Sequence, residues 1–401
     1  MNEMKPTRVG MVGSGYVARA HTLAYNNATL FRWPDLAPVE RRRIADVSME
    51  FATRGAERLG WEDAVDDWHL VTRGEDIDLV DIVTPNDTHA EIAIDAAENG
   101  KHIFCEKPMA IDGRTALAMT EAAHRAGVVN QVCFSYRAWP GVRFARRMIE
   151  EGRLGKIVHF RSWFLQDYAL DATLPMVWRL QRDKAGSGKL GDGGSHLIDL
   201  ARFLVGEVDQ VFGHLNTYIK ERPRAVETGE AVFSADGGST ETELVPVDVE
   251  DSADVLLRFE NGATGLIQTS WVAAGHKLDL GFEIGGELGA LRLSWQRGNE
   301  IEYFSTADDD ETAGFRVLPL GPSHPGYADF WKIAGQGLGM SDAFLLAVGD
   351  LLQAVQDGES APGSPDFVDG LRACEIVDAA LRSGEEESWV AVERALVPER
   401  A

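Results

Sequence analysis

The sequence predicts an α/β protein of two domains, a doubly wound parallel sheet followed by a domain built on an antiparallel or mixed sheet. The chain has 401 residues, of which 44% are hydrophobic, so it is long enough for two separate cores. Strand and helix patterns alternate up to about residue 135, which is typical of a parallel sheet covered on both faces. Strand patterns joined by turns predominate from about residue 208. We place the two domains at residues 1–135 and 136–401.

Short apolar runs are expected to form the strands of the first domain: Arg8–Gly13, Arg43–Val47, Leu79–Thr84, His102–Cys105 and Val128–Phe134. Helical patterns separate them, as at His89–Asn99 and Asp112–Ala126. Because parallel strands need long crossover connections, helices between the strands predict a parallel sheet.

Turn residues in the second domain predict two β-hairpins, Val255–Phe259 with Thr264–Ser270 and Phe282–Ile284 with Ala290–Trp295. Two helical patterns close the chain, Asp342–Asp357 and Pro365–Ser383. Gly358 and Gly384 follow them, and a glycine just past a helix commonly ends it. The stretch Arg222–Glu250 is rich in Glu, Thr, Gly and Pro, so we expect a surface insertion there.

The chain is strongly acidic. Its 39 basic and 64 acidic side chains give a formal charge of −25, which repels nucleic acid phosphates and anionic membrane surfaces. Cys105, Cys133 and Cys374 are isolated in sequence, so neither a disulfide framework nor a thiolate metal site is expected. Met1–Arg8 lacks the pattern of a signal peptide, and no run reaches the roughly 18 apolar residues of a membrane span. We expect a cytoplasmic protein that binds neither nucleic acid nor membranes.

A glycine-rich run, Gly13-Ser14-Gly15-Tyr16-Val17-Ala18, follows the first strand and opens a helix. Strand, glycine run and helix in this order predict a dinucleotide-binding turn. Gly13 permits the tight turn, Gly15 lets a pyrophosphate approach the backbone, and Ala18 keeps helix and strand close. The phosphates would lie at the N-terminus of the helix, where free amide groups favour anions.

An acidic residue at the end of the second strand usually binds the ribose hydroxyls of such a cofactor, and Asp46 is the candidate. Its carboxylate would repel a ribose 2′-phosphate, so we expect NAD in preference to NADP. Asp46 lies later than the usual spacing of about 20 residues, and Asn26–Pro38 looks like an insertion before the strand. The run Arg41–Arg43 could instead reach a 2′-phosphate, although a solvated strand entry is the preferred interpretation.

Lys107, Asp192 and His196 are the candidate catalytic residues. Asp192 and His196 are four residues apart at the start of a predicted helix, and Asp199 follows on the same stripe. His196 has the pKa for proton transfer near neutral pH, with Asp192 orienting its imidazole. Lys107 can hold a substrate oxygen and stabilise developing negative charge, or relay the proton itself. The sequence leaves open which of the two is the base, and carboxylates near a helix start also serve as caps.

Five motifs lie in order along nearly the whole chain: Thr84-Pro85-Asn86-Asp87-Thr88-His89, Glu106-Lys107-Pro108, Tyr136-Arg137 with Pro140, Trp178-Arg179, and the stretch Gly188–Asp199. Together they resemble those of the Gfo/Idh/MocA family of sugar and polyol oxidoreductases. The resemblance implies an N-terminal Rossmann domain, a C-terminal α/β domain with a large, open, mostly antiparallel sheet, and a nicotinamide cofactor between them. It also implies a homodimer or homotetramer formed through that sheet.

The resemblance further implies roles for individual residues. Besides the glycine run and Asp46, the cofactor would be lined by Thr84, Pro85, Asn86, His89, Glu106, Lys107, Trp178 and Arg179. The substrate would be lined by Lys107, Tyr136, Arg137, Trp163, Gln166, Asp192, His196 and Asp199.

The expected function is NAD-dependent oxidation of a secondary ring hydroxyl of a neutral cyclic polyol or pyranose, of the inositol or anhydrosugar type. We expect no metal site, because no second histidine lies near Asp192 and His196 in sequence. Two alternatives stay open. One is a glycoside-cleaving enzyme that uses bound NAD in an internal redox cycle, and the other is a non-catalytic dinucleotide-binding sensor.

Overall fold

The computed structural model describes residues 4–224 and 243–397 and begins with a parallel sheet of six strands. Its order is β3-β2-β1-β4-β5-β6, with β1 at Thr7–Val12, β2 at Val39–Ala45, β3 at Asp63–Val65, β4 at Leu79–Ile82, β5 at His102–Cys105 and β6 at Asn130–Val132. The connecting helices are α1 at Tyr16–Phe31, α2 at Met49–Leu59, α3 at His69–Thr72, α4 at His89–Glu98 and α5 at Gly113–Ala126. The predicted doubly wound sheet is confirmed. In such sheets ligands bind where the strand order reverses, which here is between β1 and β4.

The second sheet has nine strands in the order β16-β15-β14-β13-β7-β12-β11-β8-β17. Among the described strands of this sheet, only β7 and β12 pair in parallel, so the sheet is mostly antiparallel as expected. Both predicted hairpins are present, as β11–β12 and β13–β14. The strands are β7 at Ile157–Leu165, β8 at Val208–Asn216, β11 at Ser252–Phe259, β12 at Thr264–Ser270, β13 at Asp279–Gly286, β14 at Gly289–Ser294, β15 at Glu300–Ser305, β16 at Arg316–Pro319 and β17 at Val390–Ala391. A separate hairpin pairs β9, Glu221–Pro223, with β10, Leu244–Pro246.

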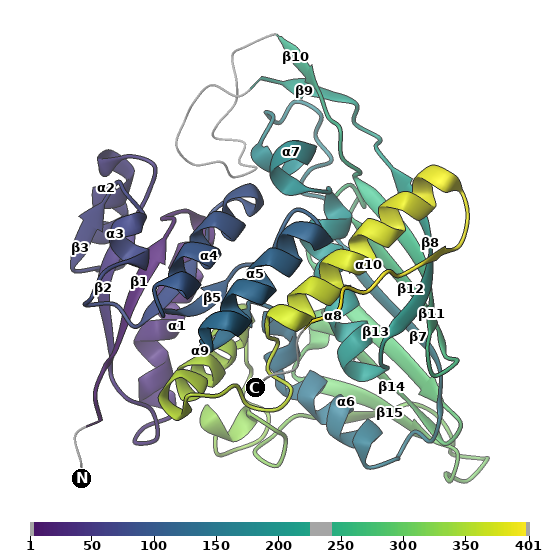
Figure 1. Ribbon diagram of the computed structural model, residues 1–401. Helices are drawn as coiled ribbons and strands as arrows, with labels where there is room; N and C mark the ends of the chain where they lie inside the picture. Colours follow the sequence, from purple (N-terminus) through teal and green to yellow (C-terminus); the bar gives the residue numbers. More distant parts are fainter. Residues whose placement is uncertain (1–3, 225–242, 398–401) are drawn as a thin grey trace.

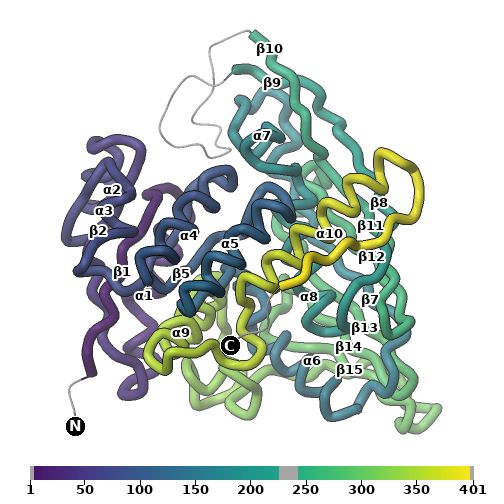
Figure 2. Tube along the Cα trace, in the orientation of Figure 1, coloured from purple at the N-terminus to yellow at the C-terminus, as the bar shows by residue number. Residues whose placement is uncertain are grey.

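Helices cover one face of this large sheet and tie it to the first domain (Figure 1). Those on the sheet are α6 at Pro140–Glu150, α8 at Ser195–Leu204 and α10 at Phe367–Glu386, whereas α7 at Arg182–Ala185 and α9 at Met340–Asp357 contact the first domain. Helices α9 and α10 return to the N-terminal domain, where α9 packs against α1 and α10 packs against α5 (Figure 2). The backbone N–H of Val132, at the end of β6, donates to the carbonyl of Pro365 at 2.9 Å. The end of the chain therefore fixes the two domains against each other.

Two sequence expectations about the helices need correction. The stretch Asn26–Pro38 is not simply an inserted loop, because α1 continues to Phe31 and the guanidinium of Arg32 pairs with Asp329 and Asp350. Gly384 does not end the last helix but lies inside α10, where a Cβ would come within 2.3 Å of Leu215 on β8. The glycine is there for close packing of helix on strand.

The expected insertion Arg222–Glu250 is buried at both ends. Arg222 is fully buried and donates to the carbonyls of Asp171 and Ala169, and Glu250 is 4% exposed. Residues 225–242 lie outside the described residues. No helix among the described residues combines the length and the apolar character that crossing a membrane requires.

Gly186 tests the contact between the domains, and Gly127, which also has a positive φ but no close neighbour in the described part of the chain, serves as the comparison. Both have positive φ, 82° and 64°, but a Cβ on Gly186 would lie 2.2 Å from the carbonyl oxygen of Ile111, whereas no described atom lies within 4 Å of one on Gly127. Gly127→Ala should cost about 1–2 kcal/mol of unfolding free energy from backbone strain. Gly186→Ala should cost about 1–3 kcal/mol more from the clash. Equal losses in urea unfolding would contradict this contact.

Candidate active site

A cavity of about 1530 Å³ lies between the two domains. Its N-terminal wall is formed by the loops that follow β1, β2, β4 and β5, which meet at the carboxyl edge of the parallel sheet. Its C-terminal wall comes from the end of β7, the turn Trp178–Leu180, and a π-helical turn at Leu190–Gly194 that leads into α8. The cavity thus lies at the predicted position for a dinucleotide.

The glycine run has the geometry that a phosphate-binding turn requires. Gly13 has φ of +103°, and a Cβ there would lie 2.8 Å from the carbonyl oxygen of Val83. At Gly15, just before α1 begins at Tyr16, no described atom lies within 4 Å of an added Cβ. The backbone at Gly15 is therefore open to the cavity, and Ser14, Tyr16 and Val17 line it as well. These residues fit the pyrophosphate of a dinucleotide.

Asp46 follows β2 directly and lines the same end of the cavity, where it accepts a hydrogen bond from the Ser14 N–H at 2.9 Å. The side chains of the run Arg41–Arg43 do not line the cavity. Their guanidinium groups bind the Leu59 carbonyl, Glu62 and Asp63. Sequence analysis missed Arg54 and Arg58, which line the cavity from α2. Their spacing of one helical turn was the available signal.

Thr84, Pro85 and Asn86 line the cavity after β4, but the buried side chain of His89 does not. His89 Nε2 lies 2.9 Å from the carbonyl oxygen of Thr84, and Nδ1 lies 3.2 Å from that of Pro108. His89 therefore joins the loops that follow β4 and β5, rather than facing a cofactor.

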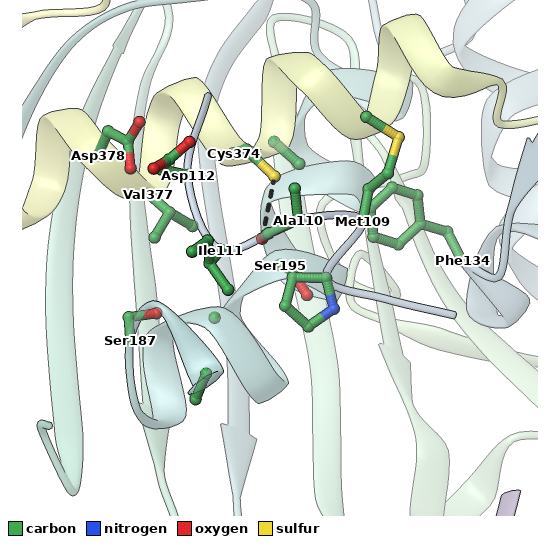
Figure 3. Close-up of a pocket in the computed structure, with 14 residues that line it drawn as sticks. Met109, Ala110, Ile111, Asp112, Phe134, Ser187, Ser195, Cys374, Val377 and Asp378 are labelled. Carbon is green, nitrogen blue, oxygen red and sulfur yellow. Dashed lines mark hydrogen bonds between the residues drawn. The ribbon is translucent and has the colours of Figure 1, made fainter. Parts of the chain in front are cut away.

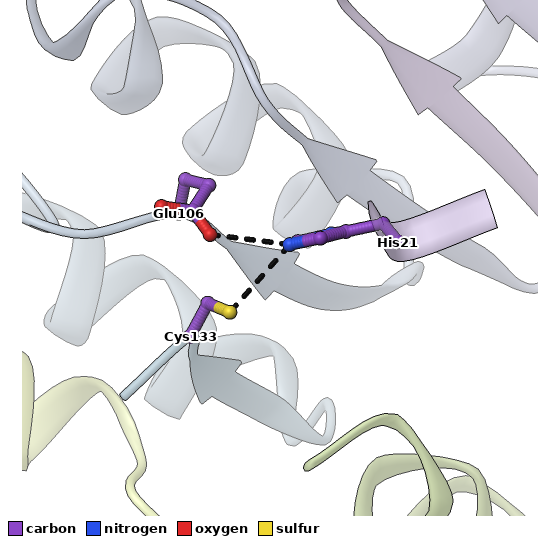
Figure 4. Close-up of side chains that lie close together, drawn as sticks. All are labelled: His21, Glu106 and Cys133. Atoms are coloured by element: carbon purple, nitrogen blue, oxygen red, sulfur yellow. Dashed lines mark hydrogen bonds and ion pairs between the residues drawn. The ribbon is translucent and has the colours of Figure 1, made fainter. Parts of the chain in front are cut away.

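Glu106 is held by a buried imidazole that sequence analysis did not identify. His21 Nε2 lies 3.1 Å from Glu106 Oε1 and 3.5 Å from Cys133 Sγ (Figure 4), while Nδ1 lies 3.0 Å from Asp81. Burial alone would raise the pKa of Glu106, but the hydrogen bond and charge of His21 lower it to about 2. The candidate ligand atoms of His21, Glu106 and Cys133 lie within 4.8 Å of one another, which is close enough to hold a metal ion. The hydrogen bonds among these three side chains account for their arrangement without one.

Lys107, Asp192 and His196 all line the cavity where the domains meet. Lys107 Nζ donates to Asp192 Oδ1 at 3.2 Å and to the Asp192 backbone carbonyl at 2.9 Å. Burial would raise the pKa of Asp192, but the charges of Lys107 and Lys189 hold it well below its usual range. The carboxylate is therefore ionised and shared between two lysines.

The expectation that Asp192 orients the imidazole of His196 is wrong. His196 Nδ1 has no hydrogen-bond partner among the described residues, because the oxygens of Asp192 are directed at Lys107 and Lys189. Instead the ring is packed edge-on against Tyr136 at 4.8 Å between centroids. Burial and the charge of Lys107 lower the pKa of His196 to about 3. The imidazole is thus neutral near pH 7 and carries one unprotonated ring nitrogen.

Tyr136 and Gln166 line the cavity beside this cluster, together with Trp178 and Arg179, whose guanidinium lies 4.3 Å from the Trp178 ring centroid. Trp163 does not. It lies on the opposite face of β7 from Phe164, and its Nε1 donates to Asp279 at 2.7 Å. Side chains alternate along a strand, so a shift of one residue reverses the face.

Arg137 and Asp199 also lie outside the cavity. Arg137 forms ion pairs with Asp199 and with Asp369, and both Arg137 and Asp199 are buried. This cluster joins the segment after β6 to α8 and α10. Breaking a buried ion pair by removing one partner is strongly destabilising, so these two residues stabilise the fold behind the site.

A second, smaller pocket lies on the other side of Pro108, between the loop 108–112 and α10 (Figure 3). Its volume is about 10 Å³, room for about one water molecule. The Cys374 thiol donates to the Ala110 carbonyl across it. A sugar or a cofactor does not fit there. The large cavity is the candidate active site because it holds the glycine run together with Lys107, Asp192 and His196.

Comparisons with known proteins agree with this geometry. Residues 7–134 match the oxidoreductase family with an NAD-binding Rossmann fold, and residues 142–292 match the GFO/IDH/MocA C-terminal domain. The chain is 40% identical over 389 residues to levoglucosan dehydrogenase of Pseudarthrobacter phenanthrenivorans, covering 97% of this chain and 99% of that protein. It is 25% identical to myo-inositol 2-dehydrogenase of Thermotoga maritima, covering 97% and 99%.

Solved structures give the same result. A levoglucosan dehydrogenase in complex with NADH and levoglucosan superimposes with a TM-score of 0.90 at 39% identity, covering 97% of this chain and all of that one. A levoglucosan dehydrogenase in complex with NADH and L-sorbose gives a TM-score of 0.91 at 40% identity, covering 96% of this chain and 99% of that one. The chain belongs to the Gfo/Idh/MocA family of NAD-binding oxidoreductases.

Proposed function

We propose that this protein is an NAD-dependent dehydrogenase that oxidises a secondary ring hydroxyl of an anhydrosugar or a cyclic polyol to the ketone. The observation that carries the proposal is the cluster of Lys107, Asp192 and His196, which joins both domains inside a cavity that begins at the dinucleotide-binding turn. The likeness to enzymes named for levoglucosan and inositols supports the choice of substrate class.

The cofactor is held by the glycine run and Asp46 at one end, and by Thr84, Pro85, Asn86, Glu106, Trp178 and Arg179 toward the other. When bound, NAD supplies an acceptor for the hydride from the carbinol carbon. The dinucleotide is NAD rather than NADP because the Asp46 carboxylate would oppose a 2′-phosphate.

The protein's part of the reaction is to hold the substrate hydroxyl and take its proton. Lys107 Nζ, anchored by Asp192, donates a hydrogen bond to the hydroxyl oxygen and stabilises the negative charge that grows there. His196, with a neutral imidazole, accepts the proton. Tyr136 and Gln166 offer neutral polar groups and an aromatic face to a ring bearing several hydroxyls.

The test is NADH formation. Purified protein, NAD and a panel of levoglucosan, myo-inositol and D-glucose should give one NADH per substrate oxidised for at least one sugar. Lys107→Met should lower turnover by at least about a hundredfold, with the affinity for NADH unchanged. No NADH from any substrate, or full activity in Lys107→Met, would refute the proposal. Product without net NADH would favour an internal redox cycle.

The pH dependence follows from the neutral state of His196. Activity of a base rises as the pH passes its pKa, and burial with the charge of Lys107 lowers that of His196 to about 3. Between pH 5 and 7, kcat/KM should therefore show no midpoint near the ordinary histidine value of about 6.5. His196→Asn should lower kcat/KM about a hundredfold at every pH in this range. A midpoint near 6.5 that disappears in His196→Asn would contradict the assignment.

We also propose that the face of the large sheet away from the helices joins two copies of the chain. Leu256, in the middle of β11, is 44% exposed there and pairs across the strands with Leu266. Light scattering should give a mass of at least two chains. Leu256→Glu should lower that mass, whereas Leu30→Glu, at a position 73% exposed on α1, should not. A monomeric wild-type protein would contradict the interface.

A further inference from the structure

Lys189 lies completely buried behind the wall of the cavity, where the reaction scheme above gives it no role. Its Nζ donates to Gln166 Oε1 at 2.7 Å and to Asp192 Oδ2 at 3.3 Å. The ammonium also lies 4.2 Å from the centroid of the Phe164 ring. All three partners line the cavity, so Lys189 contacts the site from behind.

The space for this side chain is built into the π-helical turn. A Cβ on Gly193 would lie 2.8 Å from Lys189 Cε and 2.9 Å from Nζ. Burying an ammonium is costly unless its donors are satisfied, and here two oxygens and an aromatic face surround it. Burial lowers the pKa of Lys189 to about 8, while Asp192 limits the fall, so the group is charged near neutral pH.

The first consequence concerns Gln166. A lysine ammonium can only donate hydrogen bonds, so the amide oxygen of Gln166 must face Lys189. The backbone is fixed too, because the Gln166 N–H donates to the Ser270 carbonyl at 2.9 Å. The amide nitrogen Nε2 donates to no other group in the described part of the chain, and it is the group that Gln166 offers to the cavity. A substrate atom that it binds must be an acceptor.

The second consequence concerns Asp192. Its Oδ2 is held by Lys189, and its Oδ1 accepts from Lys107. With one oxygen fixed from behind, the carboxylate cannot rotate away from Lys107 without losing a buried ion pair.

We propose that Lys189 is a positioning residue: it fixes Gln166 as a hydrogen-bond donor toward an ether or hydroxyl oxygen of the sugar, and it keeps Asp192 on Lys107. This rests on the proposed function of the same cavity, which it deepens by giving the hydrogen-bonding polarity of one substrate contact.

A double-mutant cycle in kcat/KM tests the coupling. Lys189→Met and Gln166→Met should each lower kcat/KM by about ten- to a hundredfold, the range for a hydrogen bond involving a charged group. If Lys189 acts through Gln166, the double variant should lose clearly less than the product of the single losses. Lys189→Gln, which retains a donor, should recover part of the loss. Additive losses, or an unchanged kcat/KM in Lys189→Met, would overturn the proposal.

A second measurement does not depend on turnover. In a crystal structure of Lys189→Met, the Gln166 side chain should leave its present position or adopt more than one, while the NADH affinity stays that of the wild type. A Gln166 side chain that has not moved would overturn the positioning role. If the wild-type protein oxidises no sugar, the proposed function fails, and this structure still decides whether Lys189 positions Gln166.

Discussion

The structure depends on one ion pair that crosses from one domain to the other. Lys107 belongs to the loop after β5 of the parallel sheet, and Asp192 belongs to the π-helical turn before α8. Their contact fixes the distance between the cofactor side and the substrate side of the cavity. The rest of the fold supports it from a distance, because α9 and α10 return to the first domain and hold both walls in place.

The charges around this pair give Asp192, Glu106 and His196 each one dominant protonation state near neutral pH. Asp192 is ionised between two lysines, and Glu106 is ionised beside His21. His196 lies among aromatic rings and stays neutral. Proton transfer needs such a division, since a base must be unprotonated while the group that stabilises an oxyanion stays charged. Neighbouring positive groups keep the two carboxylates ionised against the effect of burial, whereas burial is the main cause that keeps His196 neutral.

Much of the fold could be predicted from the sequence, because it follows from local patterns. The periodicity of the apolar runs gave the parallel sheet, and turn residues gave the two hairpins. The glycine run could be identified because Gly13 needs a positive φ that other residues rarely adopt. Gly384 was misinterpreted as a helix end, since nothing local reveals that Leu215 on β8 packs against it.

The site was predicted less completely, because it depends on contacts between residues that are distant in sequence. Lys107, Asp192 and His196, which the motifs singled out, lie together in the cavity, and their catalytic role stays a prediction. Lys189 and His21 were missed because a buried charged residue has the same local pattern as an exposed one, and only the folded chain gives it partners.

The opposite error arose where a motif residue has a partner distant in sequence. Arg137 was expected to bind substrate, yet Asp369 lies 232 residues away along the chain and pairs with it in the structure. Trp163 was placed on the wrong side because its position differs by a single residue from that of Phe164, which does face the cavity.

The most direct test of this account is a crystal structure of the protein with NADH and a sugar that it oxidises. The account predicts that one hydroxyl oxygen of the sugar lies within hydrogen-bond distance of both Lys107 Nζ and His196 Nε2, with Lys107 still paired with Asp192. A sugar whose hydroxyls contact neither group, or a Lys107 that has left Asp192, would contradict the claim that the domain-crossing ion pair forms the reaction centre.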